Sequence, residues 1–176
     1  MNFVPHEYQK QAISWLVQRP EAALFLEPGL GKTSCVLTAF QALRAAGAVR
    51  KMLIVAPLRV CEMVWSRSGE LGKWEDFHDL TVALVHGSDK AAALAREADL
   101  YVINFDGLPW LCEGDRLAGL VRRGVDVLVM DELSKLKHTN TDEIIEALET
   151  GLSSDEPLIV NVDEGEEGER VQVYIG

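Results

Sequence analysis

The stretch from Gly29 to Thr33 reads Gly-Leu-Gly-Lys-Thr, a combination of residue types that can hold a chain of phosphates. Glycines let backbone N–H groups wrap an anion without a side chain in the way. The Lys32 ammonium would reach the β and γ phosphates, and the Thr33 hydroxyl would bind magnesium. The alternative is an ordinary glycine turn. The pattern predicts a phosphate-binding loop for ATP and Mg²⁺, with contacts from Pro28, Gly29, Leu30, Gly31, Lys32, Thr33 and Ser34.

A pair of carboxylates is the second chemical feature. Asp131 and Glu132 directly follow the apolar run 127–130, which indicates a buried strand. In nucleotide hydrolases such a strand delivers one carboxylate that helps hold magnesium and a second that polarises the attacking water. Taken alone, the pair is also typical of a helix N-terminus. Together with the loop, it predicts Asp131 as a metal-side residue beside Thr33, and Lys32, Asp131 and Glu132 as the catalytic residues.

The elements around the loop are suited to positioning it. Residues 22–26 form a short apolar run, which predicts a strand that leads into the loop. Apolar positions then recur at helical spacing up to Leu43, and Gly47 is expected to end that helix. A strand, a glycine loop and a helix in this order aim the positive end of the helix dipole at the phosphates.

The first 138 residues alternate strand and helix patterns, which is typical of a parallel sheet covered by helices on both faces. The strand patterns are continuous apolar runs, so both faces of these strands are expected to be buried. The sequence therefore predicts a three-layer α/β domain with a mainly parallel sheet. A first helix is expected from about residue 5, further strands at 52–56, 81–85, 100–104 and 125–130, and further helices at 60–71, 90–98 and 115–123.

The pattern changes after His138, and we place a boundary there between a domain of residues 1–138 and a tail of residues 139–176. Residues 141–148 predict one short acidic helix. Residues 158–162 and 171–175 alternate like the two strands of a β-hairpin. Such a hairpin would either extend the edge of the main sheet or pair with its counterpart in a homodimer. The sequence leaves both arrangements open.

The net charge of −11 is concentrated in this tail, which has eleven acidic residues and one basic residue, Arg170. Residues 1–138 are close to neutral. Proteins that bind DNA usually present a basic surface, because phosphate contacts supply much of the affinity. The charge distribution therefore gives DNA binding only weak support. The tail is expected either to dock on a basic partner or to act as a solubilising appendage.

The sequence does not indicate a membrane or secreted protein. No apolar run approaches the roughly 20 residues that span a bilayer, and residues 1–7 lack a secretion signal. We therefore expect a cytoplasmic location. Cys35, Cys61 and Cys112 are too far apart for a zinc or redox pair and are expected to be reduced core or near-core residues. The tryptophans are expected to pack rather than to stack on bases; they are Trp15, Trp65, Trp74 and Trp110.

Five motifs, in order, resemble the first RecA-like domain of superfamily 2 helicases, and most of all the Swi/Snf-type DNA-dependent ATPases in their compact phage and bacterial form. Residues 5–9, Pro-His-Glu-Tyr-Gln, resemble the Q motif, which implies that Gln9 reads the adenine edge. The phosphate loop is similar to motif I. Residues 55–60 resemble motif Ia, residues 103–108 the next DNA-side motif, and residues 131–137 motif II.

The resemblance covers residues 1 to about 138, and it implies more than these residues contain. The family continues after motif II with a serine- or threonine-containing strand and a second RecA-like domain that carries an arginine finger. Neither motif is present in residues 139–176. An arginine finger contributes on the order of 10³ to 10⁵ in rate. The resemblance therefore implies binding of ATP and magnesium, weak hydrolysis by this chain alone, and a need for a second RecA-like domain or protein partner.

Two classes of function remain open from the sequence. The chain is either a helicase-type ATPase half-motor, with DNA as a further partner, or a non-catalytic interaction protein. In the second case the helicase-like body serves as a scaffold, and the acidic tail engages a basic partner or imitates the charge of DNA.

Overall fold

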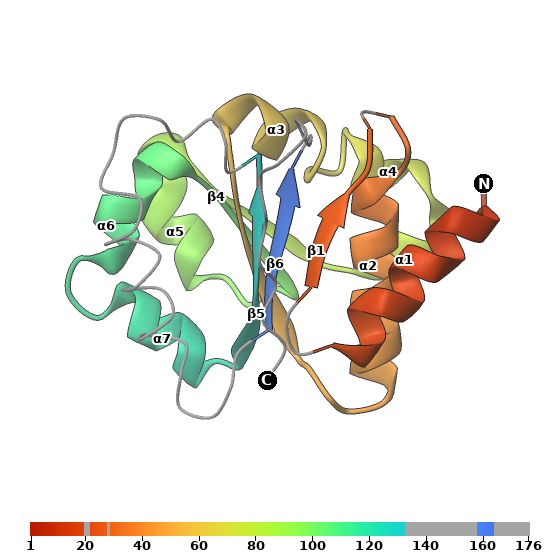
Figure 1. The fold of residues 1–176 in the computed structure, drawn as a ribbon. Coiled ribbons are helices and arrows are strands. Elements are labelled where there is room, and N and C mark those ends of the chain that lie inside the picture. The colour runs from red at the N-terminus through yellow and green to blue at the C-terminus, as the bar shows by residue number, and fades with distance from the viewer. Residues whose placement is uncertain (20–21, 28, 133–157, 164–176) are drawn as a thin grey trace.

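The computed structural model describes residues 1–19, 22–27, 29–132 and 158–163 (Figure 1). Within them, six strands form one sheet in the order β1-β6-β5-β2-β4-β3, and every neighbouring pair is parallel. All strand carboxyl ends therefore lie along one edge, where ligand sites of open parallel sheets occur. The strands are β1 (Ala22–Phe25), β2 (Lys51–Ala56), β3 (Val82–Val85), β4 (Leu100–Asn104), β5 (Val125–Asp131) and β6 (Leu158–Asp163).

Helices cover both faces of the sheet, with α1 and α2 on one side and α5, α6 and α7 on the other (Figure 1). The predicted three-layer α/β architecture with a parallel sheet is confirmed. No helix in the described ranges is long and apolar enough to span a membrane. The helices are α1 (Glu7–Gln18), α2 (Lys32–Ala45), α3 (Leu58–Met63), α4 (Glu70–Lys73), α5 (Lys90–Ala95), α6 (Leu108–Cys112) and α7 (Arg116–Arg122).

Two apolar cores lie against the two faces of the sheet, as the continuous strand patterns predict. Successive residues of one strand belong to different cores: Ile54 of β2 packs on the side of α2, and Leu53 and Val55 pack on the side of α7. The central strands are therefore buried on both faces and hold their carboxyl ends in fixed positions.

Residues 158–162 form a strand, as predicted, but its place in the fold differs from the prediction. The sequence predicts one strand of a hairpin that either extends the edge of the main sheet or pairs with a second copy, whereas β6 lies inside the sheet and pairs in parallel with both β1 and β5. Because β6 is bonded on both sides, this strand has no free edge of its own. The predicted partner strand 171–175, the acidic helix 141–148 and the boundary after His138 lie outside the described residues.

The predicted helix at 60–71 is a second correction, because it consists of two short helices. Helix α3 ends at Met63, a turn follows, and α4 starts at Glu70. The turn is stabilised by the Arg67 guanidinium, which donates to the carbonyl oxygens of Phe77 at 3.1 Å and His78 at 2.9 Å. These contacts come from outside the local sequence, so the helical spacing of apolar residues did not reveal the break.

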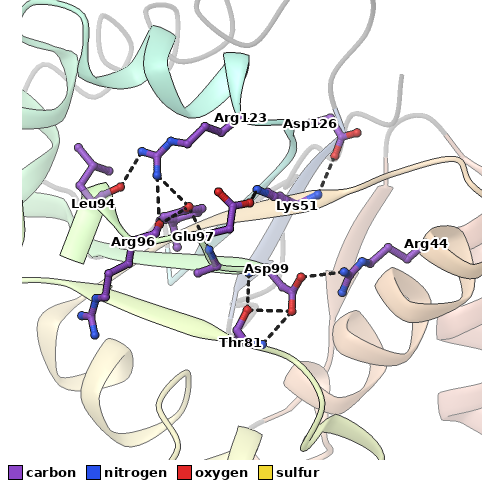
Figure 2. Close-up of polar contacts among 11 residues, drawn as sticks. Arg44, Lys51, Thr81, Leu94, Arg96, Glu97, Asp99, Arg123 and Asp126 are labelled. Atoms are coloured by element: carbon purple, nitrogen blue, oxygen red, sulfur yellow. Dashed lines mark hydrogen bonds and ion pairs between the residues drawn. The ribbon is translucent and has the colours of Figure 1, made fainter. Parts of the chain in front are cut away.

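The amino ends of the strands are joined by charged side chains (Figure 2). Asp99, just before β4, accepts hydrogen bonds from Thr81 N at 2.8 Å and Thr81 Oγ1 at 2.9 Å. Arg44, in the last turn of α2, donates to the other oxygen of Asp99 at 2.7 Å. Asp126 of β5 accepts the backbone N–H of Lys51 at 3.2 Å. At the amino edge of the sheet, these polar groups therefore bond to one another.

Candidate nucleotide site

The predicted phosphate loop lies between the carboxyl end of β1 and the first turn of α2. Gly29 and Gly31 have φ values of 81° and 79°, in the left-handed region that favours glycine. Leu30 N donates to Glu27 O at 3.2 Å, and Cys35 N donates to Gly31 O at 3.0 Å, so the loop passes directly into the helix. Pro28 lies outside the described residues. The local geometry is that of a backbone cradle at a helix N-terminus.

Gln9, the predicted adenine reader, lies against this loop. It is buried in α1, its Nε2 donates to Leu30 O at 2.9 Å, and its Oε1 accepts from His6 N at 2.8 Å. A Cβ atom on Gly31 would stand 2.5 Å from Gln9 Nε2. Residue 31 must therefore be a glycine for two reasons: its backbone is left-handed, and a side chain would collide with Gln9 of α1.

The three polar side chains at the start of α2 differ in their surroundings. Lys32 Nζ donates to Leu26 O at 3.0 Å, so the ammonium folds back over the loop. Thr33 is buried. Ser34 is fully buried, and its Oγ has no hydrogen-bond partner within the part of the chain that the structure describes. A buried hydroxyl without a partner is unusual and is consistent with a polar site nearby.

The predicted carboxylates lie where β5 ends. Asp131 is only 6% exposed, and its Oδ2 accepts a hydrogen bond from Trp65 Nε1 at 2.8 Å. Glu132 has a φ of 56°, and among the described residues it is the one non-glycine residue with a positive φ. Such a conformation costs on the order of 1–3 kcal/mol and is concentrated at functional sites.

One cavity of about 310 Å³ joins the two predicted stretches. The loop supplies one wall, and the two carboxylates at the end of β5 supply another. Gln9, Leu30 and Ser34 do not line the cavity, although Gln9 is hydrogen-bonded to Leu30 of the loop. The lining residues are Gly29, Gly31, Lys32, Thr33, Val60, Val64, Glu70, Lys73, Asp131 and Glu132.

The sequence prediction missed the wall formed by α4. Glu70 and Lys73 line the cavity, and Trp74 supports both: its Nε1 donates to Glu70 Oε1 at 3.0 Å, and Lys73 Nζ lies 4.8 Å from the centre of its ring. The spacing of Glu70 and Lys73 places them on one helix face. The sequence shows a polar and aromatic run from Glu70 to Trp74, but it does not show that this run lies against the cavity.

The two buried thiols near the site are not nucleophiles. Burial raises the pKa of Cys35 to about 11 from its ordinary value of 9.0. Burial also raises the pKa of Cys61 to about 12, and the nearby Asp131 charge adds to this increase. Both thiols are therefore protonated at neutral pH. Cys35, Cys61 and the partly buried Cys112 are free cysteines, as predicted.

The donors around the cavity fit a nucleoside triphosphate with a divalent cation. Left-handed glycines provide a cradle into which no Cβ intrudes, and an ammonium lies beside it. Oxygen donors from Thr33 and Asp131 are of the hard type that Mg²⁺ prefers. The predicted site residues that line this one cavity are Gly29, Gly31, Lys32, Thr33, Asp131 and Glu132.

A family model described as the SNF2-related domain matches residues 8–161. The chain belongs to the SNF2-related domain family. The match includes Gln9, the loop, the carboxylate pair and most of β6, so the SNF2-related domain extends beyond residue 138. The putative protein p41 of Acyrthosiphon pisum secondary endosymbiont phage 1 is 31% identical over 141 residues, which cover 77% of this chain and 29% of p41.

Solved structures show the same fold. The SWI2/SNF2 ATPase core of Sulfolobus solfataricus, solved in complex with double-stranded DNA, matches with a TM-score of 0.70 at 21% identity, over 94% of this chain and 33% of that one. The UvsW helicase of bacteriophage T4 matches with a TM-score of 0.60 at 15% identity, over 93% of this chain and 53% of that one. The SNF2-related domain is thus a first RecA-like domain and spans about a third to a half of these relatives.

Proposed function

We propose that this SNF2-related domain binds ATP and Mg²⁺ in the cavity between Gly29 and Glu132 and forms the nucleotide-binding half of a DNA-dependent ATPase. The observation that carries the proposal is the single cavity lined by both the glycine loop and the carboxylate pair. These stretches are about 100 residues apart in the sequence. Their meeting at the carboxyl edge of a parallel sheet is the arrangement that nucleotide hydrolysis requires.

Each side chain has a distinct role in the proposal. The backbone N–H groups of the loop hold the phosphates, and Lys32 turns from Leu26 O to the β and γ phosphates. Thr33 and Asp131 hold the magnesium, which when bound neutralises charge that develops on the phosphates. Glu132 orients and deprotonates the attacking water. Gln9 uses its remaining N–H to read the adenine while its other contacts fix the loop.

Hydrolysis by this domain alone is proposed to be weak. An arginine finger, worth on the order of 10³ to 10⁵ in rate, would come from outside the domain, from a second RecA-like domain or a partner protein. DNA is the proposed activator, because one structural relative was solved with double-stranded DNA. DNA would act by bringing the two halves together rather than by altering the cavity itself.

Calorimetric titration with ATP and Mg²⁺ tests the binding step. The wild-type chain should bind ATP in the presence of magnesium, and Lys32→Ala should weaken binding roughly 100-fold, by about 2.7 kcal/mol. Lys90→Ala is the matched control. Lys90 is the first residue of α5, which packs on the face of the sheet opposite to α2, the helix that begins with Lys32. Equal affinities for Lys32→Ala and the wild type would exclude the cavity as the nucleotide site.

A second candidate function, a non-catalytic scaffold, is favoured by the concentration of eleven acidic residues in residues 139–176. It proposes that the tail engages a basic partner. Because β6 lies within the sheet, deletion of the whole tail would also remove a core strand. Replacement of Glu164, Glu166, Glu167 and Glu169 by glutamine is the sharper test. Salt-sensitive partner binding should be lost in that variant, and unchanged binding would exclude the scaffold function.

A further inference from the structure

Trp65 connects the buried core to the candidate metal site. The residue follows α3, its side chain is fully buried, and its Nε1 donates to Asp131 Oδ2 at 2.8 Å. The two residues are 66 positions apart in the sequence. Asp131 lines the cavity, so this indole N–H acts on a carboxylate that is proposed to hold magnesium.

The turn that carries Trp65 is held in place independently of Asp131. Val64 N donates to Val60 O at 2.9 Å, and Leu71 N donates to Val64 O at 3.3 Å. A Cβ atom on Gly72 would lie 1.9 Å from Arg67 O, so the backbone on the far side of the turn is in close contact. The indole is therefore anchored by its own surroundings and can act as a fixed donor.

The chemical type of this donor matters for a cation site. An arginine or lysine beside Asp131 would orient the carboxylate, but its positive charge would repel a bound cation. An indole N–H is a donor without a net charge, so it orients Asp131 without placing a positive charge beside the metal. Hydrogen bonds of this kind to metal ligands commonly change metal affinity 10- to 100-fold.

We infer that Trp65 is a positioning residue that fixes the Asp131 carboxylate for a divalent cation, an inference that rests on the proposed function. Trp65→Phe keeps an aromatic ring in the core and removes the N–H donor. The variant should need roughly 10-fold more Mg²⁺ for half-maximal ATP binding, while its ATP affinity in EDTA stays within about twofold of wild type. If Trp65 had only a structural role, the variant would bind ATP more weakly both with magnesium and in EDTA.

Trp110→Phe is the matched control. Trp110 lies in α6 and packs against the opposite core, with Arg116 4.4 Å from its ring centre. The Trp110→Phe variant should need the same Mg²⁺ concentration as the wild type for half-maximal ATP binding. If the wild-type chain binds no ATP, both the proposed function and this inference fail. If the wild type binds ATP with magnesium and Trp65→Phe has the same magnesium requirement, only the inference about Trp65 is overturned.

A double-mutant cycle with Asp131→Ala separates action through the carboxylate from general packing. In the Asp131→Ala background, Trp65→Phe should no longer change the magnesium requirement. A shift that persists there would overturn the inference. If Trp65→Phe does not fold, the wild-type chain provides the test through the ¹⁵N signals of its four indoles, with Trp65 assigned by elimination from Phe variants of the other three. The Trp65 signal should move when Mg²⁺ is added to the ATP complex, and an unmoved signal would contradict the inference.

Discussion

Helix α2 begins at the carboxyl edge of the sheet and ends at the amino edge, and its two ends have different surroundings (Figures 1 and 2). At its first residue, Lys32 lies beside a cavity that Asp131 also lines. In its last turn, Arg44 is paired with Asp99, which Thr81 also holds through two hydrogen bonds. The polar groups at the amino edge thus bind one another, whereas those at the carboxyl edge face a shared cavity.

The difference indicates how this domain separates stability from function. Charged groups at the amino edge connect the starts of β3 and β4 to α2, so they contribute to the free energy of folding. At the carboxyl edge, Glu132 lines the cavity with a positive φ of 56°, a strained conformation that is a cost to folding and that a ligand site explains. Variants at the two edges should therefore change different measured quantities.

The largest contrast is expected between the glycines that flank α2. Gly31→Ala places a methyl group 2.5 Å from Gln9 Nε2 at a φ of 79° and should weaken ATP binding roughly 100-fold. Gly47→Ala imposes a similar backbone strain, at a φ of 75°, but meets no atom within 4 Å. Calorimetry should show wild-type affinity for Gly47→Ala. Equal losses in both variants would mean that strain in α2, rather than the loop, controls binding.

A smaller effect of the opposite kind is expected at Asp99. Asp99→Ala removes the partner of Arg44 and the acceptor for Thr81, and should lower the free energy of unfolding by about 2 kcal/mol. ATP affinity should stay within about twofold of wild type. Glu97→Ala, which removes the exposed partner of Lys51, should change stability by no more than about 0.5 kcal/mol. Urea unfolding measures the stability of both variants. A loss of ATP affinity in Asp99→Ala would show that the amino edge also controls nucleotide binding.

A further expected effect is a fall of stability with pH that arises from the two buried thiols near the nucleotide site, Cys35 and Cys61. Because burial raises the pKa of Cys35 to about 11 and of Cys61 to about 12, the folded state retains protons that the unfolded state loses above pH 9. Stability should therefore be intact below about pH 9 and fall as pH rises, by up to about 1.4 kcal/mol per pH unit for each thiol.

The control for this effect is a variant with both Cys35→Ala and Cys61→Ala. Its absolute stability will differ because two side chains are truncated, so the slope of unfolding free energy between about pH 8.5 and 10.5 is the quantity to compare. The variant should show the shallower decline. Identical slopes would show that these thiols have similar pKa values in the folded and unfolded chain.

The sequence predicted those parts of the site whose geometry is local. The loop at Gly29 to Thr33 follows from a strand, two glycines and a helix within one short segment, and all three were placed correctly. Asp131 was predicted at the end of its strand for the same reason. By contrast, the Trp65 contact with Asp131 and the cavity wall at Glu70 and Lys73 depend on how distant segments pack. Periodicity contains no information on such pairings.

β6 shows the same limit for the fold. Its residues were correctly predicted as a strand, but a short alternating pattern does not specify the neighbouring strands, and the glycines after residue 163 suggested a hairpin turn. Instead, β6 pairs in parallel with β1 on one side and β5 on the other, so it joins the strand that leads into the loop to the strand that ends at Asp131. That β6 lies beside β1, the strand that leads into the loop, could therefore be learned only from the structure.

The account is tested most directly by measuring ATP affinity and unfolding free energy on Lys32→Ala and Arg44→Ala, two truncations at opposite ends of α2. Lys32→Ala should bind ATP roughly 100-fold more weakly. Its stability should change by less than about 1 kcal/mol, because the variant removes one hydrogen bond to Leu26 O. Arg44→Ala should lower the unfolding free energy by about 1–2 kcal/mol, because it removes the ion pair with Asp99, and should retain wild-type affinity. Loss of ATP affinity in Arg44→Ala together with its retention in Lys32→Ala would contradict the account.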